Sequence, residues 1–215
     1  MEKIEIKGIN YRLNEETLTA EVIAEKEYEG DIIIPETVVF QEVAYRVTSI
    51  GEHAFYCCKS LTSIVIPDSV TSIGEFAFED CSSLTSIVIP AKVTSIETQA
   101  FLGCSSLTSI VIPAKVKSIG EGAFRDCSSL TSIVIPDSVK SIGHCAFLGC
   151  KSLTSMVIPD SVTRIITAAF YGCKSLTSIT FNGTKAQWKR IKLGNAWKND
   201  VPTKVIHCTD GDVEI

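Results

Sequence analysis

Histidine and cysteine are the residues of this 215-residue chain with the greatest capacity for chemistry, and it holds three and nine of them respectively. His144 directly precedes Cys145, and a thiol beside an imidazole is a common activated nucleophile. Neighbouring residues on an extended chain point in opposite directions, so we expect no contact between these two side chains. The chain contains neither G-x-S-x-G nor H-E-x-x-H. The sequence therefore predicts no catalytic residues, and a protein that is not an enzyme.

Metal ligands were sought in the same way. No C-x-x-C pair is present, which disfavours a structural zinc site. Asp210, Asp212 and Glu214 alternate in DGDVE, a pattern that fits either a calcium contact or a solvated hairpin turn. The turn is the favoured interpretation, and we predict no metal and no cofactor.

One ten-residue string, CSSLTSIVIP, occurs at 81–90, 104–113 and 127–136, with close variants beginning at Cys58, Cys150 and Cys173. Six of the nine cysteines therefore share a 23-residue period. A residue type at a fixed phase of a repeat is typical of one core position seen once per repeat, and a free cysteine packs as a small hydrophobic residue. We predict that these six are buried thiols, because parallel side chains in a ladder are poorly oriented for a disulfide.

A single unit, LTSIVIPDSVTSIGEFAFEDCSS at 61–83, shows what one repeat would do. SIVI has the β-branched character of a strand, Pro67 ends it, and VTSI is a second short extended piece. One unit has too few neighbours to bury its eight apolar side chains, but stacked units can bury them against one another. The pattern therefore predicts a repeat solenoid that is mainly β.

The repeated pattern L-x-x-I-x-I-P-x-x-V-x-x-I-x-x-x-A-F-x-x-C resembles the treponemal-type leucine-rich repeat of the BspA-like proteins, from residue 32 to about 181. The resemblance implies a right-handed leucine-rich-repeat coil with a parallel β-sheet. It also implies a bacterial or protozoan surface adhesin that binds host matrix proteins such as fibronectin and fibrinogen, with an extracellular or cell-surface location. The first residues lack the apolar segment of a signal peptide, so a cytoplasmic location stays open.

The ends of the chain lie outside the repeat. We predict a single domain, 1–215, with an N-terminal β-hairpin cap at 1–31, repeats at 32–181 and a C-terminal cap at 182–215. Residues 35–50 fit a first repeat with a nine-residue insertion. In the C-terminal cap, Thr184 and Gln187 predict a capping box, Gly194 the end of the helix, and Asp210-Gly211 a hairpin. Trp188 and Trp197 are predicted to cover the last coil.

Charge and hydropathy disfavour two kinds of partner, nucleic acid and a membrane that the chain would span. The formal net charge is −5, which disfavours nucleic acid, because phosphate binding needs clustered lysine and arginine. No apolar run approaches the roughly 18–20 residues needed to span a bilayer. The remaining partner class is a protein or glycan ligand.

Two groups of outward-facing residues are candidates for that ligand. Thr85, Thr108 and Thr131 recur on the first strand, where hydroxyls and methyls would form a flat array suited to a glycan or fibrous protein. Lys92, Lys115, Lys117 and Lys140 would form a basic patch suited to an acidic protein or a sulfated glycan. The alternatives are a soluble sheet face and a solvated charged edge.

The two ends differ in charge. Residues 1–31 hold nine acidic and four basic side chains, whereas 182–198 hold five basic and none acidic. This difference favours weak head-to-tail self-association, which makes a structural, self-assembling repeat protein the alternative function.

Overall fold

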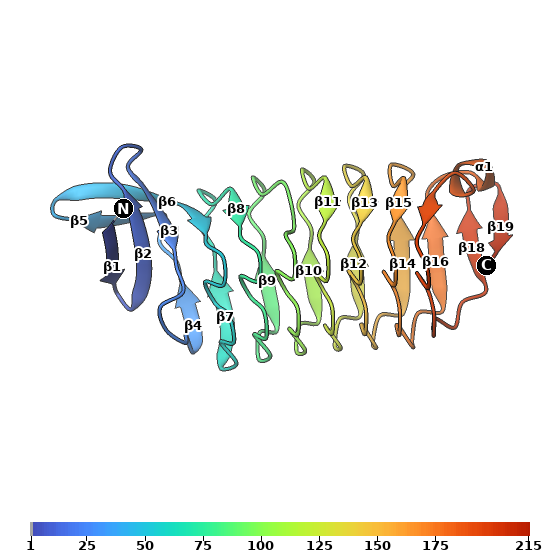
Figure 1. The fold of residues 1–215 in the computed structure, drawn as a ribbon, viewed down its shortest axis with the longest axis horizontal. Helices are drawn as coiled ribbons and strands as arrows, with labels where there is room; N and C mark the ends of the chain where they lie inside the picture. Colours follow the sequence, from blue (N-terminus) through green and yellow to red (C-terminus); the bar gives the residue numbers. More distant parts are fainter. Residues whose placement is uncertain (1) are drawn as a thin grey trace.

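The 23-residue units form successive coils of an elongated solenoid, with the two ends of the chain at opposite ends of the stack (Figure 1). This computed structural model describes residues 2–215. These residues form three sheets: sheets B and C run along the stack, and sheet A lies at its N-terminal end, within residues 2–73.

Sheet B is the longest, with nine strands in the order β19-β18-β16-β14-β12-β10-β9-β7-β4. From β4 to β18 neighbouring strands are parallel, and equivalent residues of adjacent coils are paired, as Ile64 is with Ile87 and Ile110 with Ile133. The strands are β4 Gly30–Ile33, β7 Leu61–Val65, β9 Ser86–Val88, β10 Ser109–Val111, β12 Ser132–Val134, β14 Ser155–Ile158, β16 Ser178–Phe181, β18 Val205–Cys208 and β19 Gly211–Glu214.

Sheet C forms from the second extended piece of each coil, after the turn that follows the proline. It contains β11 Ser118–Ile119, β13 Ser141–Ile142, β15 Arg164–Ile165 and β17 Lys192–Leu193. A bridge between Ile96 and Ile119 continues the pairing one coil further toward the N-terminus. The predicted pairing of two extended segments per repeat is confirmed, as is the mainly β solenoid with parallel sheets.

A stack of phenylalanine rings fills the centre of the coils. The rings of Phe78 and Phe101 are 5.4 Å apart and within 1° of parallel. The same stacking continues through Phe55, Phe78, Phe101, Phe124, Phe147 and Phe170, all of which are fully buried. Tyr28 contacts the first ring at 4.9 Å and Trp197 the last at 6.2 Å. Aromatic side chains therefore close both ends of the core.

The six periodic cysteines are buried free thiols, as predicted. Each of the last five donates a hydrogen bond to a carbonyl of the preceding coil; Cys127 Sγ, for example, lies 3.1 Å from the Phe101 oxygen. Cys58 instead accepts a hydrogen bond from the Tyr28 backbone nitrogen at 3.2 Å. The cysteine column thus ties neighbouring coils together without disulfides.

The N-terminal cap is more elaborate than the single hairpin predicted from the sequence. Sheet A holds β1 Glu2–Ile6, β2 Ile9–Asn14, β3 Thr19–Val22, β5 Thr37–Phe40, β6 Val43–Ile50 and β8 Ser72–Ile73. A single hairpin does not account for this cap, because Lys7 and Gly8 both adopt positive φ (50° and 80°) and form a tight turn between β1 and β2. The inserted residues of the first repeat form the β5–β6 hairpin, and β6 pairs with β3 and β8.

The C-terminal cap contains the only helix that the structure describes in residues 2–215, α1 Lys185–Trp188. The predicted capping box is present, with the Thr184 nitrogen donating to Gln187 Oε1 at 2.8 Å. Trp188 and Trp197 are buried with ring centroids 5.9 Å apart, which confirms their predicted covering role. The helix ends at Trp188, so the prediction that Gly194 stops it was wrong. Gly194 instead packs on the previous coil, where a Cβ would lie 2.3 Å from the Thr167 nitrogen.

Candidate binding surfaces

The outer face of sheet B carries a row of exposed β-branched side chains. Val88, Val111 and Val134 are 76%, 72% and 70% exposed, although their neighbours Ile87, Ile110 and Ile133 are buried. Alternation along each strand sends one side chain into the core and the next into solvent. Because equivalent residues are paired between coils, the row continues with Ile33 and Val65 on one side and Val157 on the other; we call these six residues the valine row.

Thr85, Thr108 and Thr131 lie beside the valine row and are exposed, where the sequence analysis placed them. Their hydroxyls are partly used within the protein. Thr108 Oγ1 donates to the Thr85 carbonyl at 3.3 Å, and Thr131 Oγ1 donates to the Thr108 carbonyl at 3.2 Å. The hydroxyls that donate in this way can still accept hydrogen bonds from a ligand. Their role in binding stays a prediction.

The four predicted lysines also lie in neighbouring coils, on a different edge of the solenoid. The Lys140 nitrogen donates to the Lys117 carbonyl at 2.9 Å, so these two residues are adjacent across the stack. Lys92 and Lys115 share the corner position that follows Pro90 and Pro113. All four lysines are exposed, and none forms an ion pair within residues 2–215. Whether they bind a ligand stays a prediction.

Two cations next to this patch were missed in the sequence analysis. Arg164 occupies the serine position of the VTSI segment, and it pairs with Lys192 between β15 and β17. Arg164 could have been found, since it replaces the serine that precedes isoleucine at this position in the other coils. Lys192 could not, because the residues of α1 shift it out of the 23-residue period.

The structure corrects one prediction about chemistry. His144 Nε2 lies 3.5 Å from Cys145 Sγ, although no contact was expected. The expectation failed because this segment is a turn, with Cys145 at φ 53°, rather than extended chain. Burial raises the pKa of Cys145, which keeps the thiol protonated, and His144 Nδ1 faces Glu121 Oε1 at 3.4 Å. The pair therefore lacks the lowered thiol pKa that an activated nucleophile needs.

The carboxylates of the DGDVE segment have partners within the cap. Asp212 Oδ1 lies 2.9 Å from His207 Nδ1, and Asp210 Oδ1 accepts a hydrogen bond from the Lys185 nitrogen at 2.7 Å. The segment forms the predicted hairpin, in which Cys208 pairs with Gly211. In the part of the chain that the structure describes, no three histidine, cysteine or acidic side chains are grouped as metal ligands would be.

One polar hollow lies between the N-terminal cap and the first coil. It has a volume of about 370 Å³ and is lined in part by Lys3, Arg12, Glu21 and Glu25. These charges neutralise one another, since Lys3 pairs with Glu25 and Arg12 with Glu21 at 2.7 Å. The hollow thus presents matched ion pairs rather than an unpaired group for catalysis.

The model of the "BspA type leucine rich repeat region" matches residues 36–153 and 117–192, with six copies. The chain belongs to this family. No curated protein matches it. Within residues 2–215, no helix has the length and apolar character needed to cross a membrane.

Solved structures of bacterial leucine-rich repeat proteins share the fold. The leucine-rich repeat protein of T. pallidum is 28% identical with a TM-score of 0.76, over 90% of this chain and 86% of that one. A leucine-rich repeat protein from Bacteroides ovatus is 28% identical with a TM-score of 0.62, over 96% and 71%. One from Bacteroides capillosus is 30% identical with a TM-score of 0.55, over 62% and 97%.

Proposed function

We propose that this BspA-type solenoid is a non-catalytic binding module of the cell-surface adhesin kind, which holds a host matrix protein or a glycan. The observation that carries the proposal is the valine row on the outer face of sheet B. Soluble proteins seldom expose a contiguous row of large apolar side chains unless the surface meets a partner. The family also supports the proposal, because its members are typically surface-associated.

The composition of this face favours a protein partner with an extended, regular surface. Val88, Val111 and Val134 offer apolar contact, while Thr85 and its equivalents offer hydroxyl acceptors beside them. The corner lysines lie on the edge that follows this face in the same coils, with Lys92 four residues after Val88 and just beyond Pro90. A ligand that covers the row can therefore combine apolar contact with charge complementarity at one edge.

Equilibrium binding to immobilised fibronectin and fibrinogen tests the proposal. The variant V88T/V111T/V134T keeps the β-branched shape but removes apolar contact, and we expect at least about tenfold weaker binding. V39T is the control, because Val39 is 61% exposed on β5 in the N-terminal cap. Absence of saturable binding to either protein, or equal loss in the control, would contradict the proposal.

Self-association is the second candidate, favoured by the acidic N-terminal cap and the basic segment at 182–198. Tyr28 and Trp197 close the aromatic stack at its two ends, so an end-to-end contact would depend on charge rather than on an open core. Light scattering at low and high salt tests this candidate. A monomer at low salt and high protein concentration would rule it out.

A further inference from the structure

Basic side chains occupy one edge of the solenoid in five successive coils. They are the four predicted lysines together with the two cations that the sequence analysis missed. All six are exposed. We call this set the basic ribbon: Lys92, Lys115, Lys117, Lys140, Arg164 and Lys192.

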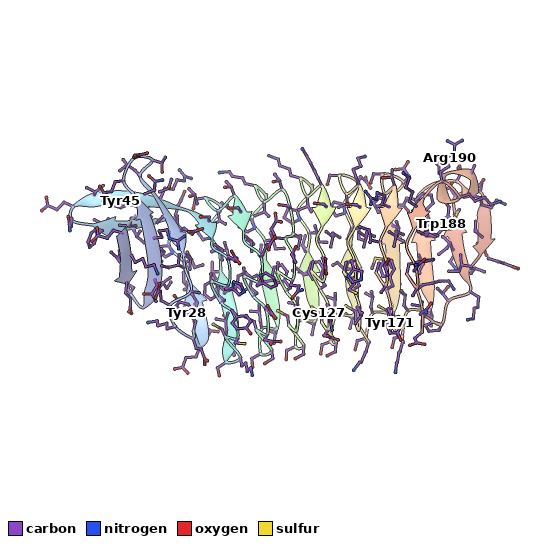
Figure 2. The ribbon with its side chains drawn as sticks, in the orientation of Figure 1. Tyr28, Tyr45, Cys127, Tyr171, Trp188 and Arg190 are labelled. Atoms are coloured by element: carbon purple, nitrogen blue, oxygen red, sulfur yellow. The ribbon has the colours of Figure 1, made fainter. Side chains whose placement is uncertain are left out.

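Backbone pairing fixes the order of the ribbon. The Lys140 backbone nitrogen donates to the Lys117 carbonyl, and Arg164 is paired with Lys192. Between these two pairs, Arg164 is paired with Ser141, the residue that follows Lys140. Coils rise by about 4.8 Å, which makes the ribbon about 19 Å long from its first coil to its last. The ribbon follows the edge of the stack that carries β11, β13 and β15 in Figure 1, and Arg190 extends from the same edge at its C-terminal end (Figure 2).

The ribbon is narrow and its charge is not neutralised. No member forms an ion pair in the described part of the chain. In the two coils that carry corner lysines, the Asp-Ser of other coils is replaced by Ala91-Lys92 and Ala114-Lys115. Each replacement raises the local charge by two. Exposed carboxylates remain beside the ribbon, at Asp137 and Asp160 on the corner.

We propose that the basic ribbon binds a single linear sulfated polysaccharide chain that lies along the axis of the solenoid. The proposal rests on the proposed binding function and names a ligand class for a second face of the module. Lysine and arginine both bind such oxyanions, lysine as a point charge and arginine through its planar fork. Thr94, Ser141 and Thr163 are backbone neighbours of Lys117, Arg164 and Lys140 respectively. Their hydroxyls can bond to sugar hydroxyls, that of Thr163 as an acceptor because it donates to the Lys140 carbonyl.

The backbone geometry favours a glycan over an acidic peptide. An extended peptide gains much of its affinity by pairing with free backbone groups at a sheet edge. Along the ribbon these groups are already used between coils, as shown by Lys117 N to Thr94 O at 3.0 Å and Lys192 N to Thr163 O at 3.0 Å. The exposed carboxylates of Asp137 and Asp160 at the corner also disfavour broad anionic surfaces, which would meet these like charges beside the ribbon.

The other coils supply neutral replacements that fit the solenoid. In K117T/K140T/R164S each cation becomes the residue found at the same position of another coil, namely Thr94, Thr163 and Ser141. The matched control is K59S/K151S/K174S, which removes the same three charges from exposed positions outside the ribbon, where Ser82, Ser105 and Ser128 occur in other coils.

Binding of both variants and of the parent chain to immobilised heparin would be measured at three salt concentrations. We expect the ribbon variant to bind about 30-fold more weakly and the control less than about threefold more weakly. We also expect the parent chain to show a steeper loss of affinity with salt than the ribbon variant, because fewer counterions are released after the cations are removed. Desulfated heparin and poly-glutamate are competitors that should fail.

Three outcomes would overturn the inference: no heparin binding by the parent chain, equal losses in the ribbon variant and the control, or equal competition by poly-glutamate. The last result would assign the ribbon to acidic peptides. Saturable binding to fibronectin or fibrinogen, together with absent heparin binding, would remove the ribbon inference while leaving the proposed function intact.

Discussion

Buried and exposed positions of one coil are neighbours in the chain, yet the residue types at these positions vary differently from coil to coil. Phenylalanine and cysteine recur without change at their buried positions, because each ring stacks on its copy in the next coil and each thiol after the first donates to a carbonyl of the preceding coil. At the corner, Ser138 Oγ and Ser161 Oγ also donate to carbonyls of the preceding coil, yet Ala-Lys replaces Asp-Ser in two coils. Uniform packing therefore constrains the inside, and the outside is free to carry a ligand-specific charge pattern.

The largest effect should come from breaking the aromatic stack. Phe101 is fully buried between Phe78 and Phe124, so Phe101→Ala should lower the free energy of unfolding by about 3–5 kcal/mol. Phe76 is the control, since it is half-buried and stacks on His53 at 4.7 Å. Urea denaturation followed by circular dichroism measures both variants. Equal losses would show that the stack is no more important than peripheral aromatic contacts.

The buried thiols should make the core sensitive to alkaline pH. Desolvation raises the pKa of Cys173 to about 12 and that of Cys127 well above the usual range. The folded state keeps these protons while unfolded thiols release theirs. The contribution of these thiols to the free energy of unfolding is therefore fully present below pH about 8.5. Above that pH, the free energy of unfolding declines by about 1.4 kcal/mol per pH unit per thiol as the pH rises toward about 12.

Urea denaturation under reducing conditions at pH 7.5, 9 and 10 measures this decline. In Cys127→Ala one titrating thiol is absent, so the free energy of unfolding should fall less steeply with pH than in the parent chain. An unchanged slope would exclude Cys127 as a source of the alkaline sensitivity.

A substitution in the C-terminal cap should cost less stability than a substitution in the core. Thr184→Ala removes the side-chain half of the capping box and should cost about 1 kcal/mol of stability. Because Trp188 belongs to the same helix, its fluorescence should shift before the solenoid unfolds in a urea titration. Thr85→Ala is the control on sheet B, and a matching fluorescence shift in that variant would argue against a local effect at the cap.

The smallest stability effect should come from the valine row. Val111 is 72% exposed, so Val111→Thr should change the free energy of unfolding by no more than about 0.5 kcal/mol. Ile110, the preceding residue, is 5% exposed, and Ile110→Thr should cost more than about 2 kcal/mol because it buries a hydroxyl and removes apolar contact. Thermal or urea denaturation compares the pair, and similar losses would contradict the inward–outward distinction.

Several features of the ends were accessible from the sequence but were not recognised. The apolar alternation of Ile4 and Ile6 shifts phase at Ile9 and Tyr11, which marks the turn at Lys7-Gly8. Gly194 was assigned to a helix end by its position after Trp188 and Ile191, which have helical spacing. Its actual constraint is close contact with the Thr167 backbone, which only the stacking of coils creates.

The candidate binding residues were predicted only in part. The four lysines were found because the 23-residue period aligns them directly. Lys192 follows Arg164 by 28 residues, and only the pairing of β15 with β17 makes them neighbours. Where a group of side chains extends from the repeats into the cap, backbone pairing thus determines which residues are neighbours.

The sequence by itself determined the solenoid, its buried columns and its outward rows, because every repeat packs against nearly identical repeats. The pattern of one repeat therefore also specifies which side chains its neighbours bring into contact with it. Tertiary structure alone decided the pairing of β3 with β6, the contact of His144 with Cys145 and the full extent of the basic ribbon. These features lie where the repeat is interrupted or turned. At such places position in the chain no longer specifies position in space, and backbone hydrogen bonds between coils set the neighbours.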